Sequence, residues 1–139
     1  MHCISDYDVK VLMALNESLK GDSKFTDFLM NNGFPELAAF SAAVHSNTDA
    51  LHWLLNNGFP EFAILSNAID GEENAILWLE KYKCHLMSLF AAACRKEDEA
   101  IKWFVDNKLD IFIFLVRTIQ QQLLYQSWDA SDPHRFRRT

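Results

Sequence analysis

The sequence Asn-Asn-Gly-Phe-Pro-Glu occurs twice in this chain, at residues 31–36 and, 25 residues later, at 56–61. An identity of six residues at a fixed offset indicates an internal repeat, and a repeat constrains the fold more strongly than any other sequence feature. Each unit of a repeat buries its apolar surface against the neighbouring units. The offset therefore predicts a stack of similar units.

Apolar residues recur with the same 25-residue period along most of the chain. Four columns carry this register: Phe28, Trp53, Trp78 and Trp103; Leu29, Leu54, Leu79 and Phe104; Leu15, Phe40, Leu65, Phe90 and Leu115; and the smaller residues Ser18, Ala43, Ala68, Ala93 and Thr118. The columns divide the chain into five units, at residues 1–25, 26–50, 51–75, 76–100 and 101–125. The first and last units diverge most, as capping repeats do.

Each unit has the pattern of two short helices joined by a turn. In the third unit, Leu51, Leu54 and Leu55 share one face of a helix. Gly58 can take the positive φ that ends this helix, and Pro60 suits the first position of the next, where its missing N–H costs nothing. The second helices are predicted at residues 36–44, 61–69, 86–94 and 110–119, and the last continues to about residue 126 because nothing interrupts it.

These patterns predict an all-α fold, a solenoid of about five stacked short helical hairpins that forms a single domain over residues 1–126. The last segment, residues 127–139, leaves the repeat register and carries three of the 13 basic residues with only two acids. Two interpretations of this C-terminal tail stay open. It is a loose or folded-back end, or a docking segment that uses Trp128, Phe136 and the arginines.

The repeat unit begins with a polar link, continues through a first helix at residues 50–58 in the third unit, and ends with a second helix that contains small residues. This unit resembles a shortened ankyrin repeat. The Leu-Leu pair at 54–55 followed by Gly58, and the paired alanines at 42–43 and 92–93, carry the resemblance. Ankyrin units have about 33 residues, so a 25-residue unit leaves no room for their β-hairpin finger. The sequence is also similar to a group of small, uncharacterised bacterial proteins with Trp-containing helical repeats. The resemblance to ankyrin stacks implies protein binding through one face.

Charge and hydropathy exclude several kinds of partner. Among 139 residues, 13 are Lys or Arg and 19 are Asp or Glu, and the formal charge of −6 repels nucleic acid. The longest apolar run, 111–116, is far shorter than the roughly 20 residues that span a bilayer. The amino terminus lacks the basic and apolar regions of a signal peptide. We expect no membrane association, a cytoplasmic location, and a monomer or weak homo-oligomer.

No constellation in the sequence predicts catalysis, a cofactor or a metal site. The five histidines are scattered, without the i, i+4 pairing that suits zinc. Cys3, Cys84 and Cys94 have no close partner, so free thiols in a reducing compartment are expected. Cys84 replaces Phe34 and Phe59 of the sister units, and we predict that it fills core space. The chain is therefore not expected to be an enzyme.

The predicted function is a non-catalytic protein–protein interaction module that binds an unidentified, possibly basic protein or peptide through one face of the stack. The alternative is a neutralising inhibitor or immunity-type protein that blocks a basic enzyme or toxin. Contact positions should vary between repeats, and acids in the links either cap helices or form a binding ridge. The candidate contact residues are Asn67, Arg117, His45, Asp70, Arg95, Gln120, Glu72 and Glu73.

The tryptophan column admits two interpretations. Trp53, Trp78 and Trp103 lie one repeat apart, so they could pack between units as the common apolar filling of the stack. A row of indole rings could also hold an extended peptide by stacking. The packing interpretation is favoured because repetition of one large apolar residue is what contact between neighbouring units requires.

Overall fold

The structure, a computed structural model, describes residues 2–82 and 84–131, with side chains up to residue 126. Every regular element in these ranges is helical, which confirms the predicted all-α class. The elements are η1 (Ile4–Asp6), α1 (Val9–Leu19), α2 (Ser23–Asn31), α3 (Pro35–Val44), α4 (Thr48–Asn56), α5 (Pro60–Ile69), α6 (Glu73–Lys81), α7 (His85–Cys94), α8 (Asp98–Asp106) and α9 (Asp110–Ser131).

The repeated Asn-Gly-Phe-Pro sequence forms the predicted turn between two helices. Gly33 and Gly58 have φ of 88° and 87°, in the left-handed region that glycine enters without steric cost. The prolines that follow take the first positions of α3 and α5. In the fifth unit, Lys108 takes a positive φ of 53° in place of glycine. The same hairpin is thus built from a different turn sequence in that unit.

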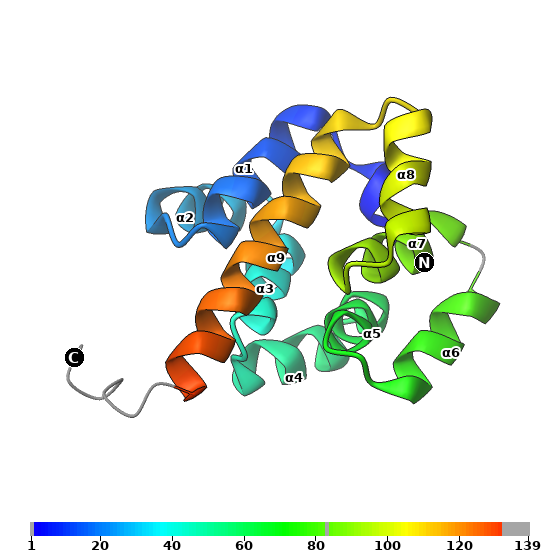
Figure 1. Cartoon of the computed structure of the whole chain (residues 1–139). Coiled ribbons are helices and arrows are strands. Elements are labelled where there is room, and N and C mark those ends of the chain that lie inside the picture. Colours follow the sequence, from blue (N-terminus) through cyan, green and yellow to red (C-terminus); the bar gives the residue numbers. More distant parts are fainter. Residues whose placement is uncertain (1, 83, 132–139) are drawn as a thin grey trace.

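The odd-numbered helices pack side by side and bring the two ends of the repeat together (Figure 1). Along the chain α1 packs on α3, α3 on α5, α5 on α7 and α7 on α9, and α9 then packs on α1. At this junction Thr118 Oγ1 donates to Asn16 Oδ1 at 2.6 Å. The even-numbered helices lie outside, each packed on the odd helices before and after it. Contact between first and last units goes beyond the nearest-neighbour packing of an open solenoid.

Three of the four columns of the repeat form the core. Leu15, Phe40, Leu65, Phe90 and Leu115, one from each odd helix, are fully buried, and the small residues of the neighbouring column are buried beside them. From the even helices come the buried residues Leu29, Leu54, Leu79 and Phe104. One apolar column from each layer therefore fills the interior, so the repeat register specifies the core directly.

The last helix is long, as predicted, and reaches Ser131. The backbone of residues 127–131, which the sequence assigned to the C-terminal tail, is helical. The remainder of that predicted tail, 132–139, lies outside the described residues. In the described part of the chain, no helix combines the length and apolar character that crossing a membrane requires.

Candidate functional site

The first residues of the chain form a strap, residues 2–8, that runs across the amino-terminal ends of α3, α5 and α7. Ile4 of the strap is fully buried in the core. Tyr7 packs on Phe34 and Phe62, with ring centroids 6.0 and 6.2 Å apart, and His2 packs on Phe59 at 4.7 Å. The strap therefore covers the turns that the repeated sequence forms.

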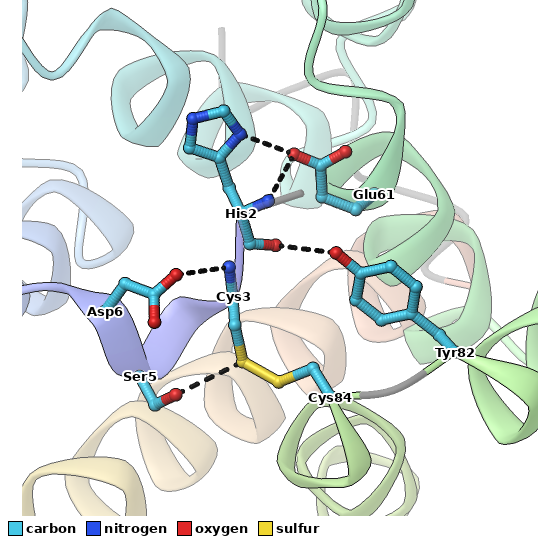
Figure 2. The surroundings of a disulfide bond; sticks show 7 residues. All are labelled: His2, Cys3, Ser5, Asp6, Glu61, Tyr82 and Cys84. Atoms are coloured by element: carbon cyan, nitrogen blue, oxygen red, sulfur yellow. Dashed lines mark hydrogen bonds and ion pairs between the residues drawn. A yellow bond between two sulfur atoms is a disulfide. The ribbon is translucent and has the colours of Figure 1, made fainter.

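Two buried carboxylates hold the strap, and both belong to the repeated Asn-Asn-Gly-Phe-Pro-Glu sequence. Glu36 is 6% exposed, and its Oε2 accepts a hydrogen bond from the Tyr7 hydroxyl at 2.7 Å. Glu61 is 1% exposed, and its Oε1 accepts from the backbone N–H of His2 at 3.2 Å and lies 2.9 Å from His2 Nδ1 (Figure 2). Each carboxylate sits in the first turn of its helix, where the helix dipole favours negative charge.

A disulfide between Cys3 and Cys84 joins the strap to the turn before α7 (Figure 2). The expectation of free thiols is wrong for these two cysteines, and Cys84 is a covalent partner of the strap and not a filler of core space. Their Cα atoms lie 6.2 Å apart although 81 positions separate them in sequence. Sequence spacing could not reveal this pair, because the strap reaches the fourth unit only in the folded chain. Cys94 is buried and free, as predicted.

Two phenols at the strap, Tyr7 within it and Tyr82 at the end of α6, have raised pKa values. Burial, the hydrogen bond to Glu36 and the nearby negative charges of Glu36, Asp6 and Glu61 raise the pKa of Tyr7 well above its ordinary value. Burial, followed by the charges of Glu61 and Asp6, raises the pKa of Tyr82 as well. The Tyr82 hydroxyl donates to the backbone carbonyl of His2 at 3.4 Å. Each protonated phenol is therefore a hydrogen-bond donor that ties the strap to the helices.

Three of the predicted contact residues contact the carboxyl-terminal end of the preceding odd helix. His45 Nε2 donates to the carbonyl of Leu19 at 2.8 Å, Arg95 Nη1 to that of Ala68 at 2.8 Å, and Gln120 Nε2 to that of Ala93 at 2.8 Å. These carbonyls lie in or next to the last turn of their helices, where the regular i→i−4 hydrogen bonds end. The side chains therefore act as caps from the next repeat, alongside the backbone N–H groups of Gly71 and Lys96 that also bond the carbonyls of Ala68 and Ala93. The residue type varies at this repeat position because an imidazole, a guanidinium or an amide can each donate the same hydrogen bond to a backbone carbonyl.

The fourth residue at this repeat position, Asp70, has no proton to donate when it is ionised. The carbonyl of Val44, which lies one repeat after that of Leu19, accepts instead from Gln126 Nε2 of α9 at 3.2 Å. Asp70 and Asn67 line a polar cavity of about 140 Å³ together with Ser46, Asn47 and Thr48. Burial raises the pKa of Asp70 above its ordinary value. The structure thus brings together two of the predicted contact residues at this cavity.

The other predicted contact residues lie apart from that cavity. Arg117 is exposed and lines a small hollow of about 60 Å³ with Gln120. Glu72 and Glu73 are exposed at the start of α6, where Glu72 occupies the N-cap position without a side-chain hydrogen bond and Glu73 is the first helical residue. In other links the caps form as expected, since Asp22 accepts from Lys24 N–H and Asn47 from Ala50 N–H. The eight predicted residues therefore do not converge on one surface, and their contact with a partner stays a prediction.

The tryptophan column packs against the core in the way that the favoured interpretation requires. Trp53, Trp78 and Trp103 are half-buried against core residues. Trp53 stacks on Phe59 at 6.1 Å, and Trp78 stacks on Tyr82 at 4.8 Å. Each of these two indoles covers the aromatic residue of its own turn. The contacts favour packing over a ladder for a bound peptide.

An apolar groove lies between α1, α2 and the first turns of α9. Its volume is about 470 Å³, and five large apolar side chains line it: Met13, Phe25, Phe28, Ile111 and Phe114. Met13 and Phe114 are each 56% exposed and Phe28 is 45% exposed. Lys10, Asn16 and Glu17 supply its polar edge. No local stretch of sequence predicts this groove, because it forms only where the first and last units meet.

Neither a metal set nor a known relative identifies a site. Within residues 2–82 and 84–131, no three His, Cys, Asp or Glu side chains gather as metal ligands. No protein-family model, curated protein or solved structure matches this chain. Function has to be inferred from the strap, the groove and the charge distribution.

Proposed function

We propose that this protein is a non-catalytic interaction module that binds an amphipathic helix of a partner protein in the groove between α1, α2 and α9. The observation that carries the proposal is the group of large, exposed apolar side chains gathered in one groove of about 470 Å³. Contiguous apolar surface of this kind marks interaction sites on proteins that otherwise bury such residues. Aromatic residues and methionine are also enriched at interfaces, where methionine adapts its shape to the bound surface.

The groove is lined by side chains of three neighbouring helices and is mainly apolar, which suits the apolar face of another helix. Helix-in-groove recognition uses apolar anchors spaced one turn apart, and the exposed rings of Phe25 and Phe28 are themselves one turn apart on α2. The formal charge of −6 favours a partner helix with a basic polar face. The chain as a whole is then a stack of five hairpins, curved until its ends meet, and the meeting point supplies the binding surface.

The test uses two synthetic 18-residue amphipathic helices with the same leucine face, one with a lysine polar face and the other with a glutamate polar face. Fluorescence anisotropy should show the lysine peptide binding at least tenfold more tightly. Phe28→Ser and Phe114→Ser should each weaken that binding at least tenfold, since central aromatic anchors dominate interface energetics.

The matched controls are Leu77→Ser and Val105→Ser, which remove apolar side chains of similar exposure, 52% and 53%, outside the groove. These variants should bind as the wild type does. Equal binding of the two peptides would contradict the basic-partner part of the proposal, and binding insensitive to the groove variants would contradict the site. If sedimentation shows a dimer that Phe114→Ser dissociates, the occupant is a second copy and not a partner helix.

The alternative, a neutralising inhibitor of a basic enzyme or toxin, is favoured by a different observation. Glu72 and Glu73 at the start of α6, and Glu97, Asp98 and Glu99 at the start of α8, are all exposed. An acidic ridge of this kind would steer a basic partner toward the links. Reversal of Glu72 and Glu73 to lysine should abolish capture of such a partner, whereas binding through the groove should fall only modestly.

We also propose a cytoplasmic location. In a reducing compartment the Cys3–Cys84 bond is expected to be open, and cell fractionation with trapping of free thiols would test both points.

A further inference from the structure

We propose that the Cys3–Cys84 disulfide is a thiol-exchange site for dithiols and that its reduction releases the strap from Glu36 and Glu61. The disulfide is the one covalent restraint that the structure describes on the strap. The other restraints are the hydrogen bonds from His2 and Tyr7 to the two carboxylates, the hydrogen bond from Tyr82, the packing of the Tyr7 and His2 rings on the turns, and the burial of Ile4. Loss of the covalent restraint leaves a short segment held by a few contacts.

The two sulfur atoms have different surroundings, and these define a direction of attack. Cys84 is half-buried, whereas Cys3 is 8% exposed. An external thiolate therefore reaches Cys84 Sγ more readily. The sulfur that leaves is Cys3 Sγ, to which the Ser5 hydroxyl donates at 3.2 Å, and this hydrogen bond stabilises the departing thiolate (Figure 2).

The external thiolate forms a sulfur–sulfur bond to Cys84 Sγ, and the Cys3–Cys84 bond breaks with its electron pair on Cys3 Sγ, which takes a proton. The second thiol of the dithiol then attacks the mixed disulfide and leaves Cys84 as a thiol. The dithiol is oxidised to a disulfide, and the protein disulfide is reduced by two electrons to two thiols.

Release of the strap follows from the small number of contacts that remain. Residues 2–8 form only the short η1 turn, in which Asp6 N–H bonds to the Cys3 carbonyl and Cys3 N–H bonds to the Asp6 carboxylate. His2 is exposed, so water competes for the donors that Glu61 accepts. Helices α3 and α5 keep their packing in the core without the strap, and we expect them to stay folded after its release.

The experiment uses the full chain, first oxidised with glutathione disulfide and then treated with dithiothreitol under native conditions. Alkylation with N-ethylmaleimide followed by mass spectrometry should show two modified cysteines, Cys3 and Cys84, while buried Cys94 stays unmodified. Hydrogen exchange of the amides in residues 3–6 should accelerate at least tenfold on reduction, and exchange in the middle of α3 and α5 should not change.

Two variants distinguish release of the strap by reduction of the disulfide from a general loss of stability. Cys3→Ser should show the fast strap exchange with and without dithiothreitol, with the helical circular dichroism retained. Cys94→Ala keeps the disulfide and should respond to dithiothreitol as the wild type does. Three results would each overturn the proposal: failure of the Cys3–Cys84 bond to form on oxidation, strap exchange that is unchanged by reduction, or reduction that exposes Cys94 together with the other two. None of these results depends on partner binding in the groove.

Discussion

The two ends of the odd-numbered helices are completed in different ways. At the amino-terminal ends of α3, α5 and α7, one continuous segment, the strap, contacts all three helices through Tyr7, His2 and Cys3. At the carboxyl-terminal ends, separate side chains such as Arg95 and Gln120 each cap one neighbouring helix. Contacts that share one segment should be lost together, whereas separate caps should act independently.

The largest expected effect comes from the disulfide. Cys3→Ser removes a cross-link that spans 81 positions and, on the chain-entropy estimate for loops of this size, should lower the free energy of unfolding by about 4 kcal/mol. Urea unfolding under oxidising conditions measures this loss. Cys94→Ala, a change in the core away from the strap, should cost far less, and an equal loss in both variants would show that the cross-link has no special role.

The next effect separates the two repeated glutamates. Glu61 contacts two nitrogen atoms of His2, whereas Glu36 accepts one described hydrogen bond from Tyr7. Glu61→Gln should therefore lower the free energy of unfolding more than Glu36→Gln, both within about 1–3 kcal/mol, the range for hydrogen bonds to charged groups. The exposed Glu80→Gln serves as the control in the same urea titration. Losses that add fully to that of Cys3→Ser would argue against a shared segment.

Alkaline pH tests the same end of the helices through Tyr7. Its pKa is raised above the ordinary 10.0, so the folded protein binds more protons than the unfolded chain once the pH exceeds about 10. The Tyr7 contribution is fully present below pH 10 and is lost as the pH rises above it. Tyr7→Phe should lower stability by about 1 kcal/mol at pH 8 and flatten the decline between pH 10 and 12.

Tyr82 provides the matched comparison for that titration. Its pKa is raised too, but its hydrogen bond to the strap is long, at 3.4 Å. Tyr82→Phe should therefore change the alkaline decline less than Tyr7→Phe does. If Tyr82→Phe changed the alkaline loss of stability more than Tyr7→Phe does, the phenol responsible for most of that loss would be Tyr82 and not Tyr7 of the strap.

The smallest effect concerns the separate caps at the other end. Gln126→Ala leaves the Val44 carbonyl without its donor and should cost about 0.5–1.5 kcal/mol. In this background Asp70→His should recover most of the loss, because His45, one repeat earlier, donates to the carbonyl of Leu19, which is the equivalent of Val44. Thermal unfolding of the single and double variants measures the recovery. A double variant no more stable than Gln126→Ala would contradict the equivalence of these positions.

Sequence reasoning succeeded where the information is periodic. The fixed offset located the helices and turns, and the columns that contain Leu15 and Leu54 predicted which side chains are buried. It missed contacts that depend on where distant segments lie in space. The column of His45, Arg95 and Gln120 varies between repeats, which suggested partner contacts, whereas in the structure each side chain donates to a backbone carbonyl of the preceding repeat.

The candidate sites lay largely beyond the reach of the sequence. The repeated glutamates were visible as part of the motif, yet no pattern indicated that they accept hydrogen bonds from the first residues of the chain. The groove residues Met13, Phe28 and Phe114 belong to the first, second and fifth units, so no local window contains them. A search for apolar residues at positions that the repeat assigns to solvent could have found some of them.

The sequence by itself determined the hairpin. The positive φ of Gly58 and the restricted φ of Pro60 act within a few residues, and the apolar period acts within one helix and its neighbour. Only the tertiary structure decided that α9 meets α1, that the strap crosses three turns, and that Cys3 reaches Cys84. Closure depends on the sum of small rotations between successive units. No short stretch of sequence encodes the total rotation, although that rotation decides which residues of the first and last units come into contact.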